Sequence, residues 1–208
     1  MRRSIRGSVV LAGACMLAGT GAWAQQNPST QKQSTVSADL AITYTMERGD
    51  LAASGGSFWL QGGGADAAVT LWKGFGIAAS FNGSHASNVA PGVDVNQIEF
   101  AAGPRYTYSA WNGHSGATDH RRLQLFGQGL VGGVHAFDGV FPGTSGATAS
   151  AGSFALDAGG GLNLFFTKCL GVRLLEADYV RTELPNNGSN IQNDLRLSFG
   201  LTYHIGKH

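Results

Sequence analysis

The chain has 208 residues, about the length of one domain, and its composition is unusual for a soluble protein. Glycine provides 32 residues, and only 13% of residues are charged, against about a quarter in an average soluble domain. So few charges leave little to cover a water-facing surface, and a net charge of +1 excludes the basic surface on which nucleic-acid binding depends.

The first segment, residues 1–24, is predicted to be a secretory signal peptide. It carries three arginines in its first six residues, a short apolar stretch over residues 8–17, and the small-residue sequence Ala22-Trp23-Ala24 at its end. The apolar stretch is too short to cross a membrane. A lipoprotein signal around Cys15 is the alternative, but the apolar run before that cysteine is short.

Residues 25–37 are polar and show no apolar periodicity, which predicts a flexible periplasmic lead. Removal of the signal peptide would leave Cys169 as the single cysteine, so no intrachain disulfide is expected. We interpret Cys169 as a small residue in a turn near the membrane interface.

From residue 38 onwards, apolar and polar residues alternate in segment after segment, which predicts strands with one apolar and one polar face. The alternation is purest near the end, where Leu195, Leu197 and Phe199 lie opposite Arg196 and Ser198. About ten residues is also the length that a tilted strand needs to cross a membrane. Eight strands are predicted, over residues 38–46, 65–71, 75–81, 98–108, 123–137, 154–164, 170–182 and 194–205.

Two of these strands are less regular than the others, and the connections of the barrel differ in length. Residues 123–137 have apolar side chains on both faces, and residues 170–182 change phase near Leu174 and Leu175, which predicts a β-bulge or a partly apolar interior. Tight turns are expected at residues 72–74 and 167–169. Longer loops are expected at residues 84–96, 138–152 and 185–193, and a long connection at residues 110–120 departs from the pattern of short periplasmic turns.

The two faces favour a barrel in lipid over a soluble barrel or sandwich. The polar face is mostly Gly, Ser, Thr, Ala and Asn, which suit a narrow interior better than a surface in water. Aromatic residues such as Trp72, Phe75 and Tyr203 lie near predicted strand ends, which in a membrane barrel are at the membrane–water interfaces. A sheet in lipid must also close, so the first and last strands should pair. We predict an all-β fold: an eight-stranded antiparallel up-and-down transmembrane β-barrel over residues 38–208, in the outer membrane of a Gram-negative-type bacterium.

The chain resembles the small eight-stranded outer-membrane barrels of the OmpA/OmpX type, in particular the stand-alone outer-membrane β-barrel group. It departs from them at its end, where Tyr203 is the last aromatic residue and Ile205-Gly206-Lys207-His208 follow. The resemblance is carried by IEFAAGPRYTYS (98–109), RLQLFGQGLVGGVHAF (122–137), FALDAGGGLNL (154–164), VRLLEADYV (172–180) and DLRLSFGLTYHIG (194–206).

Charged residues on the predicted polar face are the candidate functional residues. Inside a barrel they must pair or stay hydrated, because an unpaired buried charge is costly. The resemblance implies an interior ladder of ion pairs that fills the lumen, and a gate or narrow polar path is the alternative. The candidates are Asp66, Glu99, Arg105, Asp157, Arg173, Glu176, Asp178 and Arg196, with Asp194 beside them.

These features predict an outer-membrane protein with a structural or surface-interaction role rather than an enzyme, with no cofactor and no metal. The expected partners are outer-membrane lipid and lipopolysaccharide, and the barrel-assembly machinery for insertion; an extracellular partner is left unspecified. Three alternatives stay open: a narrow channel for ions or small solutes, a lipid-modifying enzyme, and a soluble lipocalin-like carrier. An eight-stranded interior is filled by side chains, which argues against wide conduction.

Overall fold

The computed structural model describes residues 36–50, 57–90, 92–112, 121–143, 146–186 and 190–206. The predicted signal peptide and nearly all of the predicted lead lie outside these ranges. Most of the connection predicted over residues 110–120 does so too. No helix within the described ranges has the length and apolar character needed to span a membrane.

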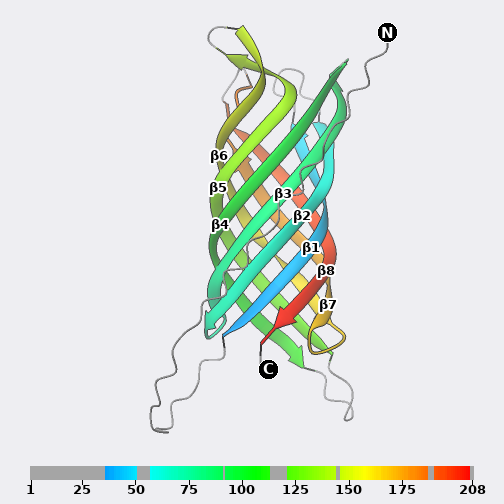
Figure 1. Cartoon of the computed structure of the whole chain (residues 1–208), viewed down its shortest axis with the longest axis vertical. Helices are drawn as coiled ribbons and strands as arrows, with labels where there is room; N and C mark the ends of the chain where they lie inside the picture. The colour runs from blue at the N-terminus through cyan, green and yellow to red at the C-terminus, as the bar shows by residue number, and fades with distance from the viewer. Residues whose placement is uncertain are drawn as a thin grey trace, which may run out of the picture. The chain divides into compact units, whose positions relative to one another are not determined.

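Eight antiparallel strands close into one barrel, in which each strand pairs with its neighbours in the chain and β1 pairs with β8 (Figure 1). The predicted strand number, order and closure are therefore confirmed. The strands are β1 (Ser37–Asp50), β2 (Ser57–Trp72), β3 (Phe75–Ala90), β4 (Val93–Asn112), β5 (Arg122–Gly143), β6 (Gly146–Phe165), β7 (Leu170–Thr182) and β8 (Gln192–Ile205).

Rows of paired residues climb along the barrel as they pass around it. A row that starts at Ser37 in β1 returns to β1 at Glu47, and this stagger tilts the strands. Because of this stagger, residues that are far apart in the chain can meet inside the lumen. The row runs from Ser37 through Thr70, Gly76, Arg105, Gln128, Gly159, Asp178 and Arg196 to Glu47.

The apolar face of the strands points outward and the polar face points into the lumen, as predicted. On β8, Leu195 and Phe199 are half exposed, whereas Arg196 and Ser198 are 3% and 2% exposed. The other strands follow the same rule; on β1, for example, Ile42 is exposed and its neighbours in the chain are buried.

The two irregular strands differ from the others for separate reasons. On β5 the inward positions include Phe126, Leu130 and Val134, so the apolar residues on both faces reflect a partly apolar lumen. On β7 the predicted bulge is present, because Leu174 and Leu175 are both exposed and the register with β6 and β8 shifts beside them.

The connections confirm the predicted tight turns and correct two of the predicted loops. Lys73 and Gly74 join β2 to β3 with φ values of 48° and 89°, the positive values that a two-residue hairpin favours. Residues 84–96 and 138–152 are mostly strand, since β3 to β6 extend into them. Where both faces of a hairpin meet water, backbone pairing needs no apolar alternation, so these extensions leave no period-two signal.

Candidate functional site

The half of the lumen nearer the start of β8 at Gln192 is organised around Arg196. Its guanidinium contacts one carboxylate from each of three other strands: Nε lies 2.9 Å from Glu47, Nη2 lies 2.5 Å from Glu99, and Nη1 lies 3.1 Å from Asp157. The side chains are at most 3% exposed. One cation on β8 therefore links β1, β4 and β6 across the barrel.

A second cluster lies around Arg173, closer to the end of the barrel where the chain ends. Its guanidinium forms ion pairs with Asp66 and, at 2.6 Å, with Glu176. Nε of Arg173 donates a hydrogen bond to Asn163 at 3.2 Å, and the guanidinium stands 4.8 Å from the centre of the Phe126 ring.

Gln128 joins the remaining candidate charges to this cluster. Arg105 donates from Nε to its side-chain oxygen at 2.9 Å, and the Gln128 amide nitrogen lies 2.9 Å from Glu176 and 3.5 Å from Asp178. Arg105 also lies over the Phe126 ring, 4.2 Å from its centre. A neutral amide thus bridges a guanidinium and two carboxylates.

All eight candidate residues face the lumen, and they fall into these two clusters. Asp194 is also buried on the inner face of β8. The charges alone did not identify Gln128 or the network at the Ile205 end of β8. There His204 contacts Asp39 at 2.6 Å, and Gln124 hydrogen-bonds to Asp39 at 3.2 Å. Asp39 and His204 lie at polar positions of the alternating pattern, which was the available signal.

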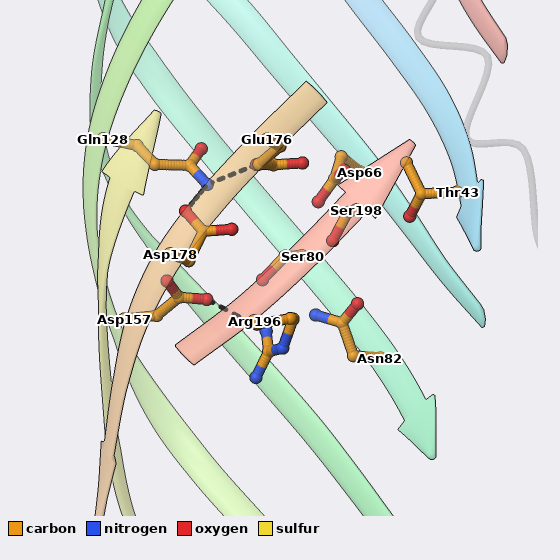
Figure 2. Close-up of a pocket in the computed structure, with 10 residues that line it drawn as sticks. All are labelled: Thr43, Asp66, Ser80, Asn82, Gln128, Asp157, Glu176, Asp178, Arg196 and Ser198. Atoms are coloured by element: carbon orange, nitrogen blue, oxygen red, sulfur yellow. Dashed lines mark hydrogen bonds and ion pairs between the residues drawn. The ribbon is translucent and has the colours of Figure 1, made fainter. Parts of the chain in front are cut away.

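A small cavity separates the two clusters (Figure 2). The centre of a water molecule could move within about 10 Å³ of this cavity, so the cavity has room for about one water. Asp157 Oδ1 and Ser80 Oγ are buried at this cavity without a hydrogen-bond partner. Within the described ranges, no group of three or more His, Cys, Asp or Glu side chains could hold a metal ion. The cavity is lined by Thr43, Asp66, Ser80, Asn82, Gln128, Asp157, Glu176, Asp178, Arg196 and Ser198.

Apolar side chains also occupy parts of the lumen beside the polar clusters. Leu130 packs with alanines of β2, β3 and β4, and a second cluster contains Val134, Phe141, Ala155 and Leu184. The described lumen therefore contains apolar groups of side chains as well as charged and uncharged polar ones.

Many of the side chains on the outer face of the barrel are large and apolar. Large hydrophobic side chains are exposed on all eight strands, a pattern that water would not tolerate and lipid favours. Aromatic residues gather at the end that carries the 73–74 turn, where the rings of Phe75 and Tyr106 lie 4.8 Å apart. Exposed examples, one for each strand, are Ile42, Leu71, Ile77, Phe100, Val131, Phe154, Leu174 and Leu201.

At the opposite end, the hairpin of β5 and β6 continues beyond its neighbour β7 (Figure 1). The pairing of β6 with β7 stops at Ala155 and Thr182, whereas the pairing of β6 with β5 continues to Gly146. Among the described strands, the residues of β6 before Ala155 have no partner on their second edge. Residues 146–150 are exposed.

No family model and no curated protein sequence matches the chain. The chain is similar in structure to Ail, the attachment invasion locus protein of Yersinia pestis, in complex with the heparin analogue sucrose octasulfate. The two are 16% identical over 82% of this chain and 99% of that one, with a TM-score of 0.52. It is also similar to Neisserial surface protein A, with 14% identity, coverage of 81% and 96%, and a TM-score of 0.55.

These similarities confirm the predicted fold: the chain has the fold of the small eight-stranded outer-membrane barrels. Combined with the apolar outer face, this fold agrees with the predicted location in an outer membrane.

Proposed function

We propose that the chain is an integral outer-membrane barrel whose β5–β6 hairpin presents a surface for binding an extracellular protein. The observation that carries the proposal is the unpaired edge of β6 before Ala155. An exposed edge strand offers free backbone N–H and C=O groups to an extended segment of another chain. Proteins usually block such edges with Lys or Pro, and residues 146–154 contain neither.

Charge at this end of the barrel favours backbone recognition over binding of a polyanion. Exposed acidic residues at the outer end include Asp94, Asp138 and Glu183, against Arg48 and Arg181. The sulfated ligand in the Ail structure therefore has no matching cationic surface among the described residues. Outer-membrane lipid and lipopolysaccharide would contact the apolar belt, and the barrel-assembly machinery would insert the chain.

The lumen clusters would have a structural role in this proposal. Arg173 and Arg196 each tie strands that are distant in the chain, so they would hold the barrel closed. The apolar outer face would then anchor the barrel in the membrane, and its protruding strands would make the contacts outside. On β3, Nε2 of His85 lies 2.8 Å from the hydroxyl of Ser87, and its Nδ1 lies 2.9 Å from Asn96 Oδ1. This nucleophile beside a base keeps the lipid-modifying enzyme as the alternative function.

Gel mobility tests the membrane half of the proposal. The full chain in isolated outer membranes should migrate faster in unboiled samples than in boiled samples, because a closed barrel resists detergent until it is heated. Recovery of the chain from the soluble periplasm, with no mobility shift, would favour the lipocalin-like carrier instead.

Shortening the hairpin tests the binding half. Phe137 and Ser150 face each other, so replacing residues 138–149 with Asn-Gly gives a two-residue hairpin and removes the edge beyond it. A non-adherent bacterial host expressing the intact chain should bind immobilised matrix and serum proteins, and the shortened variant should not. Phe141→Ala controls for the lost contact with the apolar cluster and should keep binding. Equal adhesion by the intact and shortened chains would contradict the proposal.

Labelling of cysteines on intact cells determines orientation. Cys169 is free and exposed in the turn between β6 and β7, at the expected periplasmic end. A large membrane-impermeant maleimide should label it only after lysis. Thr148→Cys in a Cys169→Ser background should be labelled on intact cells, and the reverse pattern would invert the proposed orientation.

A further inference from the structure

The two lumen clusters contain more negative than positive groups. Six carboxylates surround three guanidinium groups: Glu47, Asp66, Glu99, Asp157, Glu176 and Asp178 face Arg105, Arg173 and Arg196. The further buried pair of Asp39 and His204 lies at the Ile205 end of β8, and Asp194 lies beyond Arg196 towards the outer end. Because a buried carboxylate without a counter-charge is strongly unfavourable, this surplus requires neutralisation.

The surplus is concentrated at the cavity between the clusters (Figure 2). Asp178 is 3% exposed, and it accepts a long hydrogen bond of 3.5 Å from the neutral amide of Gln128. Asp157 shares Arg196 with two other carboxylates, and its Oδ1 has no partner. The two residues are diagonal neighbours, since Asp157 pairs with Val180 and Asp178 pairs with Gly159.

The wall of the cavity is shaped to admit the Asp178 carboxylate. A Cβ at Gly159 would lie 2.3 Å from Asp178 Oδ1, so the carboxylate occupies space that any larger residue would fill. On β3, Ser80 adds a hydroxyl oxygen that is buried and without a partner. Residues with carboxylate and hydroxyl oxygens thus line a space for about one water-sized particle.

We propose that this cavity binds one small cation, held by Asp157, Asp178 and the hydroxyl of Ser80. A bound positive charge offsets part of the surplus at the point where it is concentrated and satisfies the unpartnered oxygens, whereas a water molecule would do only the second. The bound cation is either a proton shared by the carboxylates or a dehydrated alkali-metal ion, and oxygen ligands suit both. Among the residues that the structure describes, no three His, Cys, Asp or Glu side chains are placed to hold one metal ion together, which argues against a divalent metal. This site is independent of the surface role of the β5–β6 hairpin.

Unfolding of the full chain in detergent micelles tests the proposal. The free energy of unfolding is measured at constant ionic strength in sodium, potassium and choline chloride, from mildly acidic to mildly alkaline pH. A bound proton makes the folded state lose stability as pH rises, with a change in the unfolding constant of about tenfold per pH unit for one proton. A bound alkali ion makes stability rise with sodium or potassium over choline.

Two variants assign the dependence to this site. Asp178→Asn keeps the shape of the side chain and removes its charge, so the pH or cation dependence should shrink or vanish. Ser80→Ala removes a ligand oxygen without changing charge, and should weaken a response to alkali ions. Asp94→Asn, at an exposed site on β4, should keep the wild-type dependence. The proposal is overturned if stability is the same under all conditions, or if Asp178→Asn responds like the wild type.

Discussion

Arg173 and Glu176 form a buried ion pair in the lumen, although an odd number of positions separates them along β7. In a regular strand such residues point to opposite faces. The bulge resolves this, because Arg173 pairs with Gly200 and Glu176 pairs with Ser198, leaving Leu174 and Leu175 together on the lipid side. The bulge therefore places both Arg173 and Glu176 in the cluster around Arg173.

Deleting Leu174 should leave a closed barrel. The shortened strand would alternate regularly, with Arg173 and Glu176 still inside and Leu175 outside, so only one exposed leucine and the bulge are lost. Folding is measured by the heat-dependent shift in gel mobility. Deleting Phe199 from the regular strand β8 is the control, and it should abolish the shift because it moves half of that strand to the wrong face. Loss of the barrel in both deletions would show that the bulge itself is required.

Arg196→Met should destabilise the barrel by about 3–5 kcal/mol, since it leaves three buried carboxylates without their counter-charge. Urea unfolding in micelles measures the change. Adding Glu47→Gln, Glu99→Gln and Asp157→Asn to this variant should restore much of the stability. Arg48→Met, at an exposed position of β1, should change it by at most about 1 kcal/mol. A small effect of Arg196→Met would mean that the cluster contributes little to closure.

Adjacent arginine substitutions on β8 should fail for different reasons. Leu197→Arg places a charge on the lipid face and should cost about 2–4 kcal/mol near the membrane midplane, less towards an interface. Ser198→Arg adds a cation and a large side chain to the lumen cavity, where Ser198 is 2% exposed. Folding into liposomes distinguishes them, because only the first should become milder in micelles. Unchanged folding of Leu197→Arg would contradict the assignment of faces.

Two glycines on neighbouring strands should respond oppositely to alanine. A Cβ at Gly159 would lie 2.2 Å from the backbone oxygen of Ala177 and close to Asp178, so Gly159→Ala should cost about 1–3 kcal/mol. A Cβ at Gly129 would meet nothing within 4 Å, so Gly129→Ala should be neutral or slightly stabilising. Urea unfolding compares the two, and equal effects would mean that the space over Gly159 can be refilled by local movement.

The candidate site was only partly accessible to sequence reasoning. The charges on the inner face follow from alternation, as Arg196 and Asp157 illustrate. Gln128 and Ser80 carry no charge to single them out, and their roles depend on where neighbouring strands place a guanidinium or a cavity. The sequence predicts loops where β3 to β6 extend, because both faces of these extensions meet water and the apolar periodicity is absent.

The sequence by itself determined the number of strands and the face on which most side chains lie. Alternation is a local property, set by the pleat of each strand and by the cost of placing polar groups in lipid. Only the tertiary structure decided which charges meet. Glu47, Glu99 and Asp157 reach Arg196 from strands far apart in the chain, because the stagger that closes the barrel brings them to one level of the lumen.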